Sequence, residues 1–242
     1  MKYWVDLHIH SCLSPCAESD MTPNNIVNMA LIKGLDIIAI TDHNSVGNVK
    51  AAMEVGERSG ILVVPGMELC TSEEIHLVCL FPDYENALSF ERHVYENLPP
   101  ITNREDIFGA QIIMDANDNE AGRETRFLSG ACGLDIETSL NLVRGLNGIV
   151  IPAHINRQSY SILNTLGSIP PEYGFKYLEY SKQKDTVPLC SQIEKFIQMN
   201  PELGSYNFIN SSDAHFLGDI LEQEIFFDLP DKSIQSILSV LS

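Results

Sequence analysis

The chain has 242 residues, of which 44% are hydrophobic and 20% are charged, and it carries 33 acidic residues against 15 basic ones. This length and composition predict a single soluble domain over residues 1–242, with a core large enough to fold without disulfides. The formal net charge of −18 argues against duplex nucleic acid as the main partner, because proteins that bind a phosphate backbone usually present a basic face. No apolar run reaches the roughly 18 residues of a membrane span and no secretory signal opens the sequence, so we expect a cytoplasmic protein without a membrane partner. The sequence indicates no oligomeric state.

Seven short apolar runs are predicted to be strands, because they end in polar or small residues and alternate with amphipathic stretches. A helix is expected to begin at Pro23 after the capping residue Thr22, and a second over residues 45–59. This alternation predicts a parallel sheet with crossover helices, and seven strands favour a closed or nearly closed barrel over an open sheet. The predicted strands are residues 3–9, 36–41, 61–64, 76–81, 148–152, 176–180 and 206–210.

Residues 83–145 interrupt this rhythm. They contain a polar helix over residues 85–97, a hairpin that begins near Gln111, and a further helix over residues 135–144. We interpret the segment as an insertion on one barrel loop that covers the active site. An ordinary irregular connection is the alternative.

The strongest chemical signal lies at the end of the first predicted strand, where His8 and His10 are two residues apart. Side chains at positions i and i+2 of a strand point to the same face, roughly 6.5–7 Å apart along the backbone. Two imidazoles placed in this way can converge on one metal ion, with nitrogen ligands at about 2.0–2.1 Å. Such a pair alone is weak evidence, and its meaning depends on the residues at the other strand ends.

Histidine and acidic residues recur at the ends of the other predicted strands. Six of the seven histidines lie at strand ends, and five of these six lie at C-terminal ends, where barrel enzymes build their active sites. Histidines with scattered structural roles have no reason to occupy such positions, so we predict that they share one metal site. The set comprises His8, His10, Asp42, His43, Glu68, His76, His154, Asp213 and His215.

In this order the motifs resemble those of the PHP domain family, named for polymerase and histidinol phosphatase, and especially its stand-alone metal-dependent phosphoesterases. The resemblance implies an α/β fold of the PHP type, a distorted (β/α)7 barrel, that holds two to three divalent metal ions. It covers nearly the whole chain, with residues 83–145 as the least typical part. The motifs that carry it are His8-x-His10, Thr41-Asp42-His43, Gly66-x-Glu68, His76, His154 and Asp213-x-His215.

The resemblance also implies which residues hold each ion. The third site needs one more ligand from residues 11–21, where this sequence departs from the family pattern and offers Glu18 or Asp20. Asp20 is favoured because it directly precedes the predicted helix start. Cys12 and Cys16 in the same loop are open either to structural packing or to contact with the site. The implied ligand sets are His8, His10, Glu68 and Asp213 for the first ion, Glu68, His76 and His154 for the second, and His43, His215 and Asp20 for the third.

A donor set of imidazoles and carboxylates suits Zn²⁺, Mn²⁺ or Fe²⁺ better than Mg²⁺ or Ca²⁺. Ions that share Glu68 would lie ~3.5–4 Å apart and lower the pKa of a bridging water toward ~7, so that hydroxide attacks phosphorus. We therefore expect a metal-dependent hydrolase of a small phosphate monoester or diester, nucleotides included. The candidate catalytic residues are Glu68, Asp213 and His215, with Arg157 to grip a phosphate through its forked guanidinium. Asp42 is expected to orient an imidazole.

Three other functions remain open on the sequence alone. A nuclease or DNA-processing enzyme of the PHP type would use the same metals, although the acidic charge weighs against it. An amidohydrolase-like enzyme that acts on C–N bonds also begins with His-x-His, but commonly bridges its metals with a carbamylated lysine, whereas Glu68 fills that role here. A regulatory metal-binding module without catalysis is disfavoured by the complete ligand set.

Overall fold

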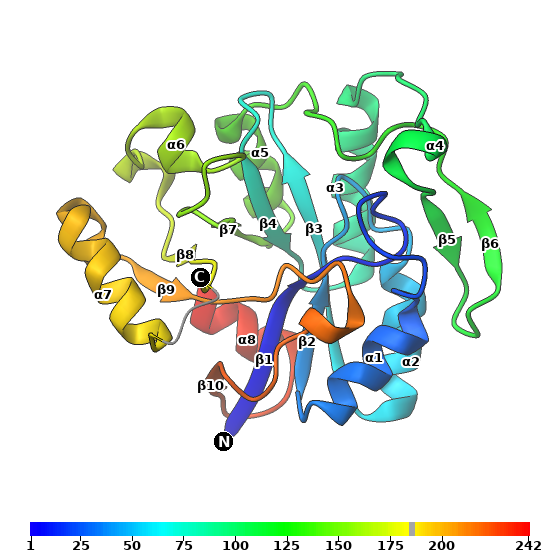
Figure 1. The fold of residues 1–242 in the computed structure, drawn as a ribbon, viewed down its shortest axis with the longest axis horizontal. Helices are drawn as coiled ribbons and strands as arrows, with labels where there is room; N and C mark the ends of the chain where they lie inside the picture. The colour runs from blue at the N-terminus through cyan, green and yellow to red at the C-terminus, as the bar shows by residue number, and fades with distance from the viewer. Residues whose placement is uncertain (184–186) are drawn as a thin grey trace.

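A curled sheet forms the centre of the molecule, and helices cover it (Figure 1). The computed structural model describes residues 1–183 and 187–242. No helix in this part of the chain is both long and apolar enough to cross a membrane. The largest sheet has the strand order β10-β1-β2-β3-β4-β7. Its strands are β1 (Lys2–Ile9), β2 (Ile37–Ile40), β3 (Leu62–Cys70), β4 (His76–Leu80), β7 (Ile149–Pro152) and β10 (Phe226–Asp228).

Two further strands continue the curl beyond β7. Strands β8 (Tyr177–Glu179) and β9 (Asn207–Ile209) pair in parallel. The backbone after β7 joins β8, because Ile155 N donates to Glu179 O at 2.9 Å. The backbone after β9 returns to β1 through a bridge between Ile9 and Ala214. All seven predicted strands are therefore present, and together they form the predicted distorted barrel.

The prediction of a parallel sheet was only partly right. Strands β1, β2 and β3 run parallel, but β4 is antiparallel to both β3 and β7, and β10 is antiparallel to β1. The reason is the short connection between Cys70 and His76, which face each other in the register of β3 and β4. A parallel partner needs a crossover of about a dozen residues or more, whereas a short turn can only make a hairpin.

The helices begin and end close to the predicted positions. Helix α1 starts at Pro23, and the Thr22 hydroxyl caps it by accepting a hydrogen bond from Asn25 N at 3.3 Å. Helix α2 is shorter than predicted, because Asn48 is turned toward the β5 strand and the helix starts only after it. The helices are α1 (Pro23–Ile32), α2 (Val49–Ser59), α3 (Tyr84–Asn97), α4 (Glu105–Phe108), α5 (Ile136–Gly145), α6 (Ile162–Leu166), α7 (Leu189–Met199) and α8 (Ile234–Leu241).

Residues 83–145 divide into a structural part and a covering part. Helix α3 buries Phe90 and Val94 in the main core and α5 buries Leu140 there, so both helices serve as connections of the barrel. The predicted hairpin is present as β5 (Ile112–Met114) and β6 (Glu120–Arg123), which stand away from the sheet beside α4 (Figure 1). The covering part of this segment is thus confined to residues 101–130.

Apolar side chains form two cores on opposite faces of the sheet. Ile38 and Ile40 belong to the core under α1, α2, α3 and α5, whereas Ile37 and Ala39 belong to the other core. Alternating side chains of a strand point to opposite faces, which explains this division. Helix α8 closes the second core with Ile237 and its neighbours. The candidate site lies on the face of the sheet that carries this second core, which is the inner face of the barrel.

Candidate metal centre

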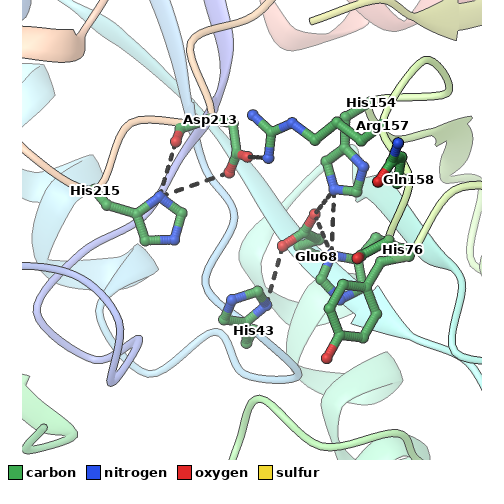
Figure 2. A pocket seen from close by; sticks show the side chains of 10 residues that line it. His43, Glu68, His76, His154, Arg157, Gln158, Asp213 and His215 are labelled. Atoms are coloured by element: carbon green, nitrogen blue, oxygen red, sulfur yellow. Dashed lines mark hydrogen bonds and ion pairs between the residues drawn. The ribbon is translucent and has the colours of Figure 1, made fainter. Parts of the chain in front are cut away.

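Glu68 lies at the middle of a cluster of histidines (Figure 2). Its side chain is 1% exposed. Each of its two carboxylate oxygens has more than one imidazole nitrogen as a neighbour. Oxygen Oε1 faces His8 Nε2 at 3.3 Å, His76 Nδ1 at 2.9 Å and His154 Nε2 at 3.2 Å, and Oε2 faces His10 Nε2 at 3.3 Å and His43 Nδ1 at 3.0 Å.

The antiparallel register explains how His76, at the start of its strand, meets residues from the ends of other strands. Glu68 lies opposite Val78, a member of the second core, so the carboxylate is on the inner face of the barrel. Because β4 runs against both of its neighbours, its first residues lie beside the last residues of β3 and β7. His76 and His154 therefore reach the same mouth of the barrel.

Four donors around His8 and His10 form the first group. Atoms of His8, His10, Glu68 and Asp213 lie within 4.8 Å of one another, as the ligand set for the first ion requires. Asp213 Oδ1 is 3.0 Å from His10 Nε2 and 3.4 Å from His8 Nε2. The structure thus brings together all four residues that were expected to share this ion.

The second group lies on the other side of Glu68. His76 and Glu68 come together as expected, and His154 Nε2 lies 3.3 Å from His76 Nδ1. His43, which the resemblance placed at the third ion, also has a donor within 4.8 Å of Glu68 and His76. His43 therefore stands between the second and third groups.

The third group contains His10, His43 and His215, whose donors lie within 4.8 Å of one another. The structure does not bring Asp20 or Glu18 to it. Both side chains are exposed and neither belongs to a donor group, so the prediction of Asp20 as a ligand is corrected. Cys16 lies there instead, with Sγ 3.1 Å from His215 Nε2. Burial opposes ionisation of this thiol, but hydrogen bonds to His215 and His43 lower its pKa to about 5.

The chemistry of the donors fits divalent cations. His8 Nε2 lies 3.2 Å from His10 Nε2. Two facing ring nitrogens can form a hydrogen bond only when one of them carries a proton and the other does not. His43 Nδ1 is buried without a hydrogen bond, although it is 3.0 Å from Glu68 Oε2. A cation between such nitrogens and carboxylates would accept a lone pair from each donor atom. The residues present therefore fit a multinuclear metal site.

The electrostatics of the cluster favour an ionised Glu68. Burial disfavours its charged form, but the imidazoles of His76, His8 and His43 hold the pKa of Glu68 well below its usual range. Burial acts against protonation of His43, yet attraction to Glu68 raises its pKa to about 10. For His76, burial together with the charges of His43 and His154 lowers the pKa to about 4 despite Glu68.

Two carboxylates behind the cluster orient its histidines. Asp42 accepts from Ser14 Oγ at 2.7 Å, and the same hydroxyl lies 2.9 Å from His10 Nδ1, so Asp42 acts on an imidazole through a serine. The sequence analysis missed Glu179, whose Oε2 is 3.0 Å from His8 Nδ1 and whose Oε1 accepts from His154 N at 3.0 Å. A glutamate inside the apolar run of residues 176–180 was the signal that could have identified it.

Hydrogen bonds to the carboxylate of Asp6 hold the loop that carries Asp213. Asp6, completely buried, accepts hydrogen bonds from Ser212 N and Leu221 N, both at 3.0 Å. Asp213 and His154 have positive φ angles of 50° and 32°, a backbone region that side chains other than glycine seldom adopt. Such strain concentrates at functional sites.

A cavity of about 300 Å³ opens onto the cluster. Arg157 lines it, and its Nη1 lies 2.5 Å from Asp213 Oδ2. Tyr160 stacks on His76 with ring centroids 4.3 Å apart and an angle of 17°. On the other side of Tyr160 a second cavity of about 280 Å³ is bordered by Cys16 and by the paired rings of Phe108 and Phe127. The covering segment therefore does contribute to the site.

Residues 6–130 match the family model of the PHP domain, which is more than half of the 242 residues. The chain therefore belongs to the PHP domain family, as its motifs indicated.

Several characterised and uncharacterised proteins resemble parts of the chain. An uncharacterized protein of Methanocaldococcus jannaschii is 34% identical over 99 residues, 37% of this chain and 58% of that protein. The phosphoribosyl 1,2-cyclic phosphate 1,2-diphosphodiesterase of Eggerthella lenta is 36% identical over 64 residues, 26% of this chain and 23% of the relative. The 5'-3' exoribonuclease Rnm of Salmonella typhimurium is 36% identical over 80 residues, 31% of this chain and 26% of the relative. Each match spans less than two thirds of the relative's length.

Solved structures share the fold over the whole chain. The lesion-specific endonuclease PfuEndoQ from Pyrococcus furiosus superimposes with a TM-score of 0.69 at 19% identity, covering 100% of this chain and 56% of the endonuclease. Endonuclease Q in complex with a 27-mer duplex gives a TM-score of 0.70 at 18% identity, with the same coverage. A protein with this fold thus binds duplex DNA, and the expectation that the acidic charge disfavours a duplex partner is not supported.

Proposed function

We propose that this chain hydrolyses a small phosphate monoester or diester with two to three divalent cations, Zn²⁺, Mn²⁺ or Fe²⁺, bound around Glu68. The observation that carries the proposal is that both oxygens of Glu68 lie within 3.3 Å of imidazole nitrogens, five in all. A buried carboxylate with nitrogen donors on both sides is suited to bridge two cations. The cations would be held by His8, His10, Glu68 and Asp213, by Glu68, His76 and His154, and by His43 and His215.

Bound divalent cations supply Lewis acidity toward the phosphoryl group and make hydroxide available from water near neutral pH. The chain's own residues position the substrate. Asp213 holds Arg157 at the cavity wall through Nη1, and the remaining N–H groups of the guanidinium can donate to phosphate oxygens. His8 and His10 are held in one orientation by Glu179 and by Ser14, so the donors need little rearrangement.

The apolar cavity beside Tyr160 favours a substrate with a flat or apolar group next to the phosphate. Tyr160, Phe108 and Phe127 border it, and it shares His43 and His76 with the cavity at the metal centre. A nucleobase or another planar organic group would bury its faces against such rings. This arrangement supports an organic phosphate ester over inorganic polyphosphate.

Hydrolysis of p-nitrophenyl phosphate and of its diester, with each of the three metals, tests the proposal. We expect Glu68→Gln to lower kcat by roughly a hundredfold to a thousandfold while the fold is kept, because the shared carboxylate is lost. We expect Arg157→Gln chiefly to raise KM, with the exposed Arg58→Gln on α2 as a control. Wild-type activity that is absent on phosphate esters but present on cyclic amides would instead identify a C–N hydrolase, and equal rates for wild type and Glu68→Gln would identify a non-catalytic metal module.

A nuclease is the second candidate, because a further cavity adjoins the one at the metal centre. A third cavity of about 520 Å³ shares Arg157 and Asp213 with the first, on the side away from Tyr160. Lys182 and Ser181 border this third cavity, so a charged backbone could continue there beyond the scissile phosphate. Incubation with single-stranded, abasic and deaminated DNA and with short RNA decides between the candidates. Cleavage of a polymer at rates above those for p-nitrophenyl esters would favour the nuclease.

A further inference from the structure

The third donor group has no acidic ligand from the loop of residues 11–21. Glu18 and Asp20 both have exposed side chains. The loop is tied to the opposite end of the chain instead, since Glu18 N donates to His215 O at 3.0 Å. Turns from Ser14 N to Ser11 O and from Ala17 N to Ser14 O close the loop tightly before that point. With the backbone of Glu18 held at His215 O, it is the side chain of Cys16 that contacts the His215 ring.

Cys16 accordingly contacts the histidines of this group. Its Sγ lies 3.1 Å from His215 Nε2, the ring nitrogen left over when Nδ1 is engaged by Asp213 O at 2.8 Å. Cys16 and His43 also border the same cavity. The donors of His43 and His215 lie within 4.8 Å of each other. Sulfur and two imidazole nitrogens therefore converge from three separate segments of chain.

The other possible donors near this group, His10 and Cys12, have other partners. His10 Nε2 faces His8 and Asp213 in the first group, and His10 Nδ1 faces Ser14. Cys12, the other thiol of the loop, is buried and its Sγ faces Ile112 O and Asn48 Nδ2. Cys16 is thus the thiol of this loop that reaches the metal centre.

We propose that Cys16 is a ligand of the third cation, together with His43 and His215. Three protein donors with an open fourth position are typical of catalytic zinc sites, and a sulfur donor favours thiophilic ions such as Zn²⁺ over Mn²⁺. His43 borders both cavities, so a cation held by these residues would be accessible from them. The inference rests on the proposed metal centre but does not depend on the reaction that the centre catalyses.

Cobalt substitution tests the ligand directly. The purified full chain is stripped of metal and titrated with Co²⁺ while absorption is recorded in the visible and near-ultraviolet ranges. We expect a thiolate-to-cobalt charge-transfer band in the wild type that disappears in Cys16→Ser and Cys16→Asp. The control Cys190→Ser, an exposed thiol on α7, keeps the band.

Metal counting on the same proteins completes the test. Cys16→Ser is expected to bind one Zn²⁺ fewer than the wild type, whereas Cys16→Asp restores the count and takes up Mn²⁺ more readily. Asp20→Asn and Glu18→Gln are expected to keep the wild-type count. Visible cobalt bands without the charge-transfer band, or a missing ion in Asp20→Asn, would overturn the role of Cys16 and leave the metal centre intact. A wild-type protein that binds no cobalt at all would overturn the proposed function itself.

Alkylation gives an independent readout. Iodoacetamide should modify both exposed thiols, Cys16 and Cys190, in the metal-free protein. Added Zn²⁺ is expected to slow the reaction of Cys16 at least about tenfold and to leave that of Cys190 as it was, because donation of a lone pair to the cation lowers the nucleophilicity of the sulfur. Equal rates at Cys16 with and without zinc would contradict the proposal.

Discussion

At the scale of single residues, Glu179 orients two parts of the cluster without belonging to a donor group. Its two oxygens engage His8 Nδ1 and the backbone N–H of His154, and it is 2% exposed. We predict that Glu179→Gln weakens cation binding by about ten- to a hundredfold, because the carboxylate no longer raises the basicity of His8. Competition with a chromophoric chelator measures the affinity, and the exposed Glu194→Gln serves as control. An affinity equal to that of the wild type would contradict this role.

Asn44 is a second buried residue whose replacement should be costly. Its Nδ2 donates to Leu128 O and Gly130 O, its Oδ1 accepts from Cys70 N at 3.0 Å, and its φ is 49°. We predict that Asn44→Ala lowers the free energy of unfolding by about 2–4 kcal/mol, since three buried groups lose their partner in a backbone region unfavourable for alanine. Urea denaturation checks this value against the exposed Asn141→Ala. A loss below about 1 kcal/mol would show that the loop at residues 128–130 rearranges freely.

Sequence reasoning at this scale identified the histidines, Glu68 and Asp213 as a converging set, because strand ends in a barrel meet at one mouth. It left Cys16 open between structural packing and contact with the site. The thiol of Cys16 contacts His215, which lies 199 residues further along the chain. A local pattern carries no information about such a contact.

At the scale of elements, the sequence predicted the positions of the strands but not the direction of β4. Seven runs of residues with strand character were enough to place the barrel, and Thr22 and Pro23 were enough to place α1. The direction of β4 depends on the turn at residues 71–75, which is too short for a crossover. The prediction that a crossover helix separates every pair of strands failed between β3 and β4, because His76 starts β4 directly after that turn.

Gly66 in β3 lies close to the side chains of Thr41 and Leu80 on the neighbouring segments. A Cβ added to Gly66 would lie 2.8 Å from Thr41 Cγ2 and 2.9 Å from Leu80 Cδ2. We predict that Gly66→Ala lowers the free energy of unfolding by about 1–3 kcal/mol through overpacking and also weakens cation binding, because Glu68 lies two residues further along β3. Gly122→Ala, where nothing lies within 4 Å of the added Cβ, is the matched control. Chemical denaturation of both variants measures the difference, and equal stabilities would show that β3 can shift at no cost.

At the scale of the whole molecule, bound cations should stabilise the native state. The donor groups exist only in the folded chain, so cations at a hundred times their dissociation constant would add about 2.7 kcal/mol per independent site. We predict that a chelator lowers the Tm of the wild type by several degrees and that Glu68→Gln shows a much smaller change. Calorimetry with and without chelator measures both shifts. A wild-type Tm that does not respond to the chelator would mean that the cluster holds no ion in solution.

The bridge between Ile9 and Ala214 closes the barrel next to the donors, with His8 O accepting from Ser212 Oγ across 204 residues of sequence. An ion shared by His8, His10 and Asp213 would link the end of β1 to the loop after β9, as a reversible crosslink does. Because Asp213 follows His8 and His10 by about two hundred residues, this link can form only once residue 213 has been synthesised. A protease cut at the exposed hairpin tip near Asn117 would then leave two fragments that stay associated until the ions are withdrawn.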